Sequence, residues 1–343
     1  MFLVQRIVNK LKKGIVATEY FAKRGGFLYF CCLLLCDRGV LNREHINGTK
    51  WITYKFYKYF ETLDKSQYYD ELIQQLPFIY GGIGKDYNIL NPMTYNEKIQ
   101  WIKAFGMTPV MSTLADKYAV RDWVSKKIGD DYLIPLVGGP WKKAEDIDFE
   151  SLPDKYVLKA NHGSGMNIVV NNGETANRSQ IKNKAHDWLN TLFGWMGMES
   201  QYFSISKCVI AEKYMEQSDG NLYDYKVFCF DGCAKFIRVH GDRNLEKHTG
   251  KQAFLDTDWK LMDFSPGDYP DFEHEIPRPS KLKELVDVAE KLAQGFSQVR
   301  VDLYIIDEHI YFGEMTFTPF CGFFPWKPAI ADREVGAFFE CKS

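Results

Sequence analysis

The chain has 343 residues, of which 45% are hydrophobic and 15% aromatic, so it can bury a large core and divide into two or three lobes. Its formal net charge of -2 argues against a general nucleic-acid binder, because these totals require no strongly basic face. Its eight cysteines lack the dense spacing of a secreted disulfide framework and form no CxxC pair. This usage indicates reduced thiols in a cytosol and argues against a cysteine-zinc site.

Residues 1 to about 90 predict a helical, irregular N-terminal extension, rich in aromatic residues and lysine and without recognisable chemistry. Its most apolar run, Phe27–Cys36, follows several basic residues but is shorter than the roughly 20 residues that span a bilayer. No small-residue cleavage site follows the run, so a secretory signal is a poor fit. A buried helix is the preferred interpretation, and a helix lying on the inner face of a membrane is the alternative.

A compact domain is expected to begin near residue 91. Thr94 followed three residues later by Glu97 predicts a capping box that opens a helix reaching Phe105. Thr113–Val124 has apolar residues at helical spacing, and Asp131–Val137 predicts a short strand with a proline at its edge.

The stretch Tyr156–Val170 is the most informative segment of the chain. An apolar β-type run carries Lys159 directly into the turn Gly163-Ser164-Gly165 and then resumes as a strand. Glycines allow successive backbone N–H groups to converge on an anion, and a lysine on the flanking strand supplies a compensating charge, so the segment is suited to binding phosphate. A plain hairpin whose turn needs glycine for positive φ is the alternative.

The next elements are a polar helix around 179–193, a strand at Cys208–Tyr214, and two alternating runs, Asp224–Phe230 and Ala234–His240. The last two runs flank Asp231-Gly232, which predicts an antiparallel hairpin. Lys226 lies on the first of these strands with Asp224 on the same face, and a surface ion pair between them is the simple interpretation. Arg238, together with Lys159 and Lys226, would provide three cations for one polyphosphate.

A helix at 279–296 precedes two further strands that carry charged residues two positions apart. Arg300 and Asp302 share one face of the first strand, and Glu314 and Thr316 share one face of the second. Two neighbouring carboxylates favour a cation between them, and Mg²⁺ suits an Asp/Glu pair that also meets phosphate oxygens. The alternative is an Arg-Glu salt bridge on a solvated sheet face.

Taken in order, these segments resemble an ATP-grasp enzyme. They resemble more closely the family named after the teichuronopeptide-biosynthesis protein TupA, whose genes are found among those for cell-surface polysaccharides such as capsules. The resemblance covers about residues 70–325. The matching stretches are Asn91–Trp101, Asp116-Lys117 with Arg121, Tyr132–Pro135, Leu158–Gly165, Asp224–Gly232, Val299–Asp302 and Gly313–Pro319.

The resemblance implies an α+β ATP-grasp fold over residues 91–343, in which two antiparallel-sheet lobes enclose the nucleotide. The closing lobe would span about 150–215 and the metal-bearing lobe about 216–325. The implied nucleotide-binding residues are Lys159, Gly163, Ser164 and Gly165 at the phosphates and Glu212, Lys213 and Met215 at the adenine. The implied metal ligands are Asp302, Glu314 and, ranked lower, Thr316, which stands where many members have asparagine. The implied catalytic cations are Arg300 at the acyl phosphate and Lys226 near the γ-phosphate, and Arg238 joins them as a catalytic candidate because it would be a third cation for the polyphosphate.

Met166 departs from the wider pattern, because another glycine commonly follows the turn, and it is expected to stiffen the loop.

The implied activity is that of a carboxylate-amine ligase that uses ATP and Mg²⁺ and forms an acyl phosphate. By the same resemblance, the acceptor is a uronic acid in a surface polysaccharide or its precursor, the donor is an amino acid or amine, and no nucleic acid takes part. A cytoplasmic location is expected, with peripheral contact with the inner membrane face as a variant.

Two other functions compete with this one. A glycosyltransferase of a capsule or O-antigen pathway would need an Asp-x-Asp motif, for which the chain offers Asp256-Thr-Asp258 in a loop. A non-catalytic nucleotide-binding protein would be favoured by loss of Lys159, Asp302 or Glu314, all of which are present.

Overall fold

The computed structural model describes residues 88–341, apart from 173–176, 219–221 and 245–248. Residues 86–194 and 198–343 belong to one compact unit. The expected N-terminal extension and its apolar run lie outside the described residues. Of the helices that are described, none has both the length and the apolar content needed to cross a bilayer.

The described chain begins with the predicted capping box. The Thr94 side chain accepts from the Glu97 backbone N–H and the Glu97 carboxylate accepts from the Thr94 N–H, which opens α6 (Tyr95–Trp101). The helix continues as a π-helical turn, η1 (Ile102–Gly106).

The single helix predicted over 113–124 is wrong in one respect, because it is interrupted. The structure has α7 (Pro109–Ala115) and α8 (Val120–Ile128), separated at Asp116. The Asp116 carboxylate accepts hydrogen bonds from the backbone N–H groups of Tyr118 and Ala119 at 2.8 and 3.1 Å. Such side-chain bonds compete with the helical hydrogen bonds, so the chain changes direction here.

The smaller sheet has four antiparallel strands in the order β1 (Leu136–Trp141), β4 (Val209–Lys213), β2 (Tyr156–Ala160) and β3 (Asn167–Val170). The strand predicted from residue 131 therefore begins later, at Leu136. Tyr156 and Leu158 pack against α9 (Arg178–Asn190) in a buried apolar cluster. Since side chains alternate along a strand, Lys159 points to the opposite face of the sheet.

The larger sheet has five antiparallel strands in the order β7 (Thr249–Asp256), β6 (Cys233–Asn244), β5 (Asp224–Phe230), β8 (Gln298–Ile306) and β9 (His309–Thr316). The predicted hairpin of β5 and β6 is confirmed. Its turn residues Asp231 and Gly232 have φ of 46° and 80°, as a two-residue type I′ turn requires.

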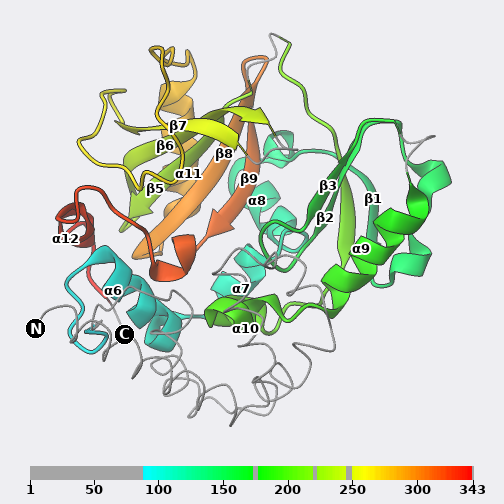
Figure 1. Cartoon of the computed structure of the whole chain (residues 1–343), viewed down its shortest axis with the longest axis horizontal. Coiled ribbons are helices and arrows are strands. Elements are labelled where there is room, and N and C mark those ends of the chain that lie inside the picture. Colours follow the sequence, from blue (N-terminus) through cyan, green and yellow to red (C-terminus); the bar gives the residue numbers. More distant parts are fainter. Residues whose placement is uncertain (1–87, 173–176, 219–221, 245–248, 342–343) are drawn as a thin grey trace, which may run out of the picture. The chain divides into compact units, whose positions relative to one another are not determined.

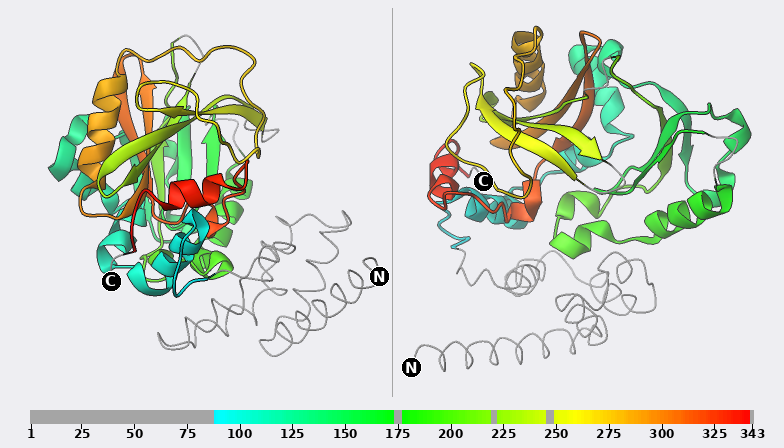
Figure 2. Two further views of the ribbon diagram at one scale, coloured as in Figure 1. Left: turned by 90° about the vertical axis from the view of Figure 1, so that its left-hand side faces the viewer. Right: turned by 45° about the horizontal axis from the view of Figure 1, so that its top comes forward.

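The two faces of the larger sheet differ in chemistry. One face carries apolar residues such as Val227 and Val301, which pack against α11 (Leu282–Ala293) together with Val120 and Val124 of α8. Figures 1 and 2 show α11 lying along this sheet, while the smaller sheet and α9 occupy the other half of the unit. The expectation of an α+β fold with two antiparallel sheets is confirmed.

The opposite face of the larger sheet is divided between aromatic and charged residues. At one end, Phe228 and Phe236 stack with ring centroids 4.6 Å apart and join Tyr95 of α6 and residues near α12 (Ala331–Gly336) in a second buried cluster. At the other end lie Lys226 and Asp302, which belong to the site described next.

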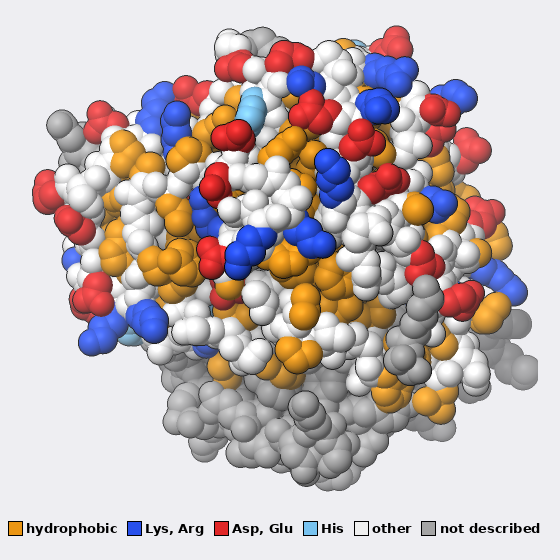
Figure 3. Space-filling model, turned by 180° about the vertical axis from the view of Figure 1, so that it is seen from behind, with side chains coloured by type: hydrophobic (Ala, Val, Ile, Leu, Met, Phe, Trp, Pro, Cys, Tyr) orange, Lys and Arg blue, Asp and Glu red, His pale blue; other side chains and the backbone are white. Residues whose placement is uncertain are grey.

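The remaining described elements are short. They are η2 (Asp130–Tyr132), η3 (Ala144–Asp146), η4 (Phe149–Ser151), α10 (Phe193–Gly197), η5 (Ser200–Tyr202) and η6 (Pro319–Gly322). On the face seen in Figure 3, basic and acidic side chains are intermingled with apolar ones, so this face shows no continuous basic surface of the kind that binds nucleic acid.

Candidate active site

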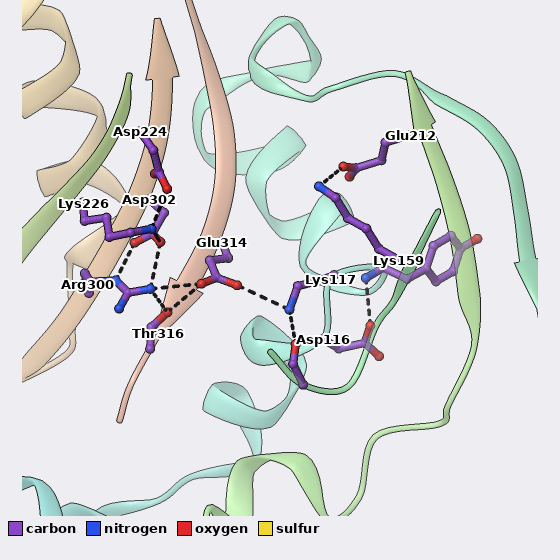
Figure 4. Close-up of polar contacts among 12 residues, drawn as sticks. Asp116, Lys117, Lys159, Glu212, Asp224, Lys226, Arg300, Asp302, Glu314 and Thr316 are labelled. Carbon is purple, nitrogen blue, oxygen red and sulfur yellow. Dashed lines mark hydrogen bonds and ion pairs between the residues drawn. The ribbon is translucent and has the colours of Figure 1, made fainter. Parts of the chain in front are cut away.

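A row of four charged residues crosses the larger sheet on one face. The strand register pairs Arg238 of β6 with Lys226 of β5, Lys226 with Asp302 of β8, and Asp302 with Glu314 of β9. Directly opposed side chains on adjacent strands lie about 5 Å apart at Cβ, which brings them within contact distance. The predicted meeting of the two carboxylates is therefore confirmed in its geometry (Figure 4).

Arg300 holds the centre of this row. Its Nε donates to Asp302 Oδ1 at 2.6 Å, and its Nη2 donates to Asp302 Oδ2 at 2.8 Å and to Glu314 Oε1 at 3.0 Å. The same Nη2 donates to the Thr316 hydroxyl at 3.0 Å. Only 9% of Arg300 is exposed, so the alternative of a solvated surface salt bridge does not apply.

Lys226 completes the neutralisation of Asp302. Its Nζ lies 2.5 Å from Asp302 Oδ2 and 2.8 Å from Asp224 Oδ2. The Lys226-Asp224 pair expected at a strand surface is therefore present, but it forms part of a buried network, since Asp224 is 4% exposed.

The two carboxylates of the row have different proton affinities. Burial raises the pKa of Asp302, although Arg300 and Lys226 work against it. Burial also opposes ionisation of Glu314, but Lys117, Arg300 and Lys226 outweigh it and lower the pKa of Glu314. For Arg300, burial is outweighed by Asp302 and Glu314, which raise its pKa. Glu314 and Arg300 are therefore charged at neutral pH.

Lys117 was not among the predicted site residues, yet it connects the two sheets. It lies between α7 and α8, and its Nζ is 3.3 Å from Glu314 Oε2 and donates to the Gly163 carbonyl oxygen at 2.6 Å. Its backbone N–H donates to the Asn161 carbonyl oxygen. The Asp116-Lys117 stretch carries part of the family resemblance, and that was the available signal.

The smaller sheet contributes a second, simpler charged group. Lys159 Nζ lies 2.5 Å from Glu212 Oε2, and Arg121 Nη1 lies 3.5 Å from Glu212 Oε1. The structure thus joins Glu212, predicted at the adenine, to Lys159, predicted at the phosphates. Arg121 was also missed, and it additionally donates to the Ile134 carbonyl oxygen at 2.8 Å.

The other residues predicted at the nucleotide base follow Glu212 directly. Lys213 is exposed and its backbone N–H donates to the Pro135 carbonyl oxygen at 2.9 Å, while Met215 is half-buried.

The Gly-Ser-Gly turn links β2 to β3, and its two glycines serve different purposes. A Cβ at Gly163 would lie 2.6 Å from both Met166 Cε and the Phe193 ring, so this position requires glycine for close packing. Gly165 has φ of +73° with open space around it, so it needs glycine for its backbone conformation. Ser164 and Gly165 are exposed, which leaves this part of the turn accessible to a ligand.

Arg238 is at the end of the row but is engaged elsewhere. Its Nη2 lies 2.6 Å from Asp268 Oδ2, and its guanidinium lies 5.2 Å from the centroid of the Phe320 ring and 5.6 Å from that of Phe254. Among the described residues it makes no contact with Lys159. The predicted set of three cations is therefore not brought together in the structure.

The donor set suits magnesium that arrives with a phosphate. Within the described part of the chain, no three or more His, Cys, Asp or Glu side chains are grouped so as to hold a metal by themselves. Mg²⁺ is commonly bound by only one or two carboxylates together with substrate phosphates, and Asp302 and Glu314 supply such a pair. The Lys117 ammonium on Glu314 Oε2 occupies a position where a cation is stabilised.

Two other features lie away from this site. Two surface hollows of about 640 and 360 Å³ are lined by residues near Phe254 and Trp259 and by residues near Trp101 and Met111, respectively. Asp256 Oδ1 accepts from the backbone N–H groups of Asp258 and Lys260, so the Asp-x-Asp sequence closes a turn at the end of β7.

The chain was also compared with protein families and with curated proteins. The family model described as TupA-like ATPgrasp matches residues 97–340. No curated protein matches the chain.

Solved structures with some similarity include D-alanine-D-alanine ligase from Bacillus anthracis, with 19% identity, 63% coverage of each chain and a TM-score of 0.35. N5-carboxyaminoimidazole synthetase from Staphylococcus aureus shows 15% identity, coverage of 60% of this chain and 44% of that chain, and a TM-score of 0.33. L-amino acid ligase from Bacillus licheniformis shows 12% identity, coverage of 74% and 52%, and a TM-score of 0.38. The chain spans less than two thirds of each of these structures.

Proposed function

This chain belongs to the TupA-like ATP-grasp family, and from that premise we propose that it is an ATP-dependent carboxylate-amine ligase that works through an acyl phosphate. The observation that carries the proposal is the buried group formed by Arg300, Asp302 and Glu314, which Lys117 connects to the Gly-Ser-Gly turn. Such a group combines fixed cations for phosphate with carboxylates for a metal.

The nucleotide is assigned to the space between the two sheets. In this assignment Lys159 and the turn Gly163–Gly165 bind phosphate, and Lys213 and Met215 lie at the adenine. Lys159 has the single ion-pair partner Glu212 among the described residues, and phosphate oxygens would replace or share that partner. Residues of about 150–215 would thereby form the closing lobe, and those of about 216–325 the metal-bearing lobe.

Asp302 and Glu314 would hold Mg²⁺, with Thr316 as an additional oxygen near Glu314. The metal supplies charge neutralisation and alignment of the phosphates. Lys226 and Arg300 would then be released in part from the carboxylates and would neutralise the oxygens of the transferred phosphate.

The reaction proceeds in two steps. A substrate carboxylate oxygen attacks the γ-phosphorus, the bond to ADP breaks, and an acyl phosphate forms beside Arg300. An amine nitrogen then attacks the acyl carbon, an amide forms, and inorganic phosphate leaves with the proton of the amine. Because both steps depend on alignment and charge, no nucleophilic side chain of the protein is needed.

For the substrates we propose a uronic acid of a surface polysaccharide or its precursor as the carboxylate, and an amino acid or amine as the nucleophile. This assignment rests on analogy with the family. Because the reaction uses ATP, we propose that it takes place in the cytoplasm. The alternative is a cytoplasmic protein that contacts the inner face of the membrane. Asp256 and Asp258 close a turn, so no observation favours the glycosyltransferase alternative.

The test is to incubate the protein with ATP, Mg²⁺, mixed uronic acids and mixed amino acids, and to measure the nucleotide products. Release of ADP that requires both an acid and an amine is the expected result. Release of AMP, or of a nucleoside diphosphate from a sugar donor in place of ATP, would contradict the proposal.

A further inference from the structure

Two side chains on the charged face of the larger sheet hold a carboxylate, and we refer to these two, Arg238 of β6 and Gln252 of β7, as the carboxylate clamp. Arg238 Nη2 donates to Asp268 Oδ2 at 2.6 Å, and Gln252 Nε2 donates to Asp268 Oδ1 at 3.0 Å. Gln252 lies opposite His240, which is two residues after Arg238, so both side chains of the clamp share one face of the sheet. This is the face that carries Lys226, the strand neighbour of Arg238.

The clamp is buried and its cation is fixed by aromatic rings. Arg238 is 2% exposed and Gln252 is 0% exposed. The Arg238 guanidinium lies 5.2 Å from the centroid of the Phe320 ring and 5.8 Å from that of Phe324. Burial lowers the pKa of Arg238, and Asp268 counteracts this shift, so an anion at the clamp stabilises the buried charge.

Asp268 uses only part of the hydrogen-bonding capacity of the clamp. Arg238 Nε and Gln252 Oε1 are buried and have no hydrogen-bond partner among the described residues. In contrast, Arg300 donates to Asp302 through Nε and Nη2 together. A carboxylate that accepted from both Nε and Nη2 of Arg238 would form the stronger bidentate arrangement, and a hydroxyl beside it could donate to Gln252 Oε1. Because unpaired buried groups are costly, a ligand that satisfied both atoms would be favoured over Asp268.

Asp268 is the accessible member of the ion pair. Its side chain is 21% exposed, whereas that of Arg238 is 3% exposed. The loop that carries Asp268 is attached to neighbouring segments by backbone hydrogen bonds at Ser265 and at Pro270. Between these points, Gly267 is exposed and has φ of +64°. A ligand carboxylate would need only the space that the Asp268 carboxylate fills, and that space is reached from the surface.

The strand register sets the distance from the clamp to the candidate active site. Arg238 lies opposite Lys226, and Lys226 lies opposite Asp302, so Arg238 is two strands away from Asp302. Neighbouring strands are about 4.8 Å apart, so two intervals give about 10 Å. A carboxylate at the clamp is therefore too far from Arg300 to be the one that is phosphorylated there.

From these observations we propose that the clamp binds a second carboxylate of the acid substrate, and that Asp268 occupies the clamp when no substrate is bound. The acid substrate is then a compound with two carboxylates about 10 Å apart, such as two linked uronic acid units, of which one is phosphorylated. Exchange of one carboxylate for the other keeps Arg238 compensated throughout. This assignment rests on the proposed ligase function, because it takes the reacting carboxylate to lie at Arg300.

Removal of the Asp268 charge distinguishes this exchange from an ordinary structural ion pair. If the pair only stabilises the fold, loss of the charge should leave binding of the acid unchanged or weaken it. If Asp268 competes with the substrate for Arg238, loss of the charge should strengthen binding. The two interpretations therefore predict effects of opposite sign.

The test compares galacturonate, which has one carboxylate, with digalacturonate, which has two, in the ADP-release assay. The wild-type chain is expected to prefer digalacturonate by about 10- to 100-fold in kcat/KM, the range expected for one charged hydrogen-bonding partner. Asp268→Asn should lower the KM of digalacturonate by about tenfold, with the KM of ATP unchanged, because the competing carboxylate is gone. Arg238→Met should abolish the preference for digalacturonate.

Asp263→Asn is the matched control, because Asp263 is an exposed aspartate of the same loop and lines the hollow near Phe254. It should keep the wild-type KM for both acids. Asp268→Ala is the second variant if Asp268→Asn does not fold. An unchanged or higher KM of digalacturonate in the Asp268 variants, or equal use of the two acids by the wild type, would overturn the assignment.

Failure of the ligase proposal can be distinguished from failure of this one. If neither acid yields ADP, digalacturonate is tested without ATP for protection against thermal unfolding. Protection that is greater in Asp268→Asn than in the wild type, and is absent from Arg238→Met, would support the clamp as a carboxylate site. Absence of protection in Asp268→Asn would refute it.

Discussion

The charged groups on the two sheets are built differently. On the larger sheet, Arg300, Lys226 and Lys117 compensate Asp224, Asp302 and Glu314 in one connected network of five ion pairs. On the smaller sheet, Lys159 has 21% of its side chain exposed and relies on Glu212, which it shares with Arg121. A network in which each charge has several partners is held more rigidly than a smaller group, because breaking one contact leaves other charges uncompensated.

This contrast indicates that the two sheets have different roles. Under the proposed function, the larger sheet would provide a preorganised binding site for phosphate and metal, and the smaller sheet would provide a lysine and a turn that adjust to the nucleotide. Lys117 belongs to both, since it contacts Glu314 and the Gly163 carbonyl oxygen.

The largest effect is expected when the two carboxylates of the larger sheet lose their charge together. Asp302→Asn combined with Glu314→Gln should lower Mg²⁺-dependent ADP release by at least about a thousandfold, because a metal shared with phosphate loses its protein ligands. A coupled ADP assay measures this. The matched control is Asp256→Asn with Asp258→Asn, which keeps the turn oxygen and should retain activity. Metal-dependent turnover in the first variant would refute the site.

Acid should act on the smaller sheet through His162. Burial, with a smaller contribution from Lys207, lowers the pKa of this histidine to about 4, although both ring nitrogens face oxygen acceptors that favour the charged ring. The unfolded chain therefore binds more protons between pH 6.5 and 4, so stability is full above pH 6.5 and falls as the pH decreases. The loss is about 3 kcal/mol over that range.

Urea unfolding at a series of pH values measures this loss, and His162→Asn should flatten the profile. Retention of the wild-type slope in that variant would assign the acid sensitivity to other groups.

Substitution of Arg300 tests whether the network depends on geometry or on charge alone. Arg300→Lys keeps the charge but cannot make the paired contacts with both Asp302 oxygens, so ADP release should fall by about a hundredfold. Steady-state kinetics should show the loss in kcat more than in the KM of ATP. Arg178→Lys, on the exposed α9 terminus, is the control and should retain wild-type rates. Wild-type kcat in Arg300→Lys would mean that charge is sufficient.

Lys159 of the smaller sheet should matter mainly for nucleotide binding. Lys159→Met should raise the KM of ATP by about 10- to 30-fold and remove the protection that ATP and Mg²⁺ give against thermal unfolding, because one phosphate contact is lost. Lys155→Met is the control, since Lys155 is exposed and pairs with Glu216. Undiminished protection in Lys159→Met would place the nucleotide elsewhere.

The sequence could predict contacts between residues that are close together in the chain. It could not predict contacts between segments that are far apart. The period of two along a strand predicts that Arg300 and Asp302 share a face, and the same rule applies to Glu314 and Thr316. Lys159 next to Glu212 is different, because it depends on β4 inserting between β1 and β2, which no local pattern indicates. The position of Lys117 next to Glu314 depends on a break between two helices and on the packing of that break near β9.

The same limit applies to Arg238. Arg238 has the predicted place in the row, but its partner Asp268 comes from a distant loop, so its ion pair could not be read from strand periodicity.

The smallest effect is expected at Met166, where the mobility of the turn on the smaller sheet can be changed without removing a charge. Its Cε lies 2.6 Å from where a Cβ at Gly163 would be, so the side chain packs beneath the turn that Lys117 holds from the other side. Met166→Gly removes this packing and should raise the KM of ATP about threefold, with faster amide exchange over residues 161–166. Met166→Leu should preserve both values, because it fills a similar volume. If Met166→Gly exchanged no faster than the wild type, the turn would owe its order to Lys117 alone, and the two sheets would be more tightly coupled than their separate ion-pair groups suggest.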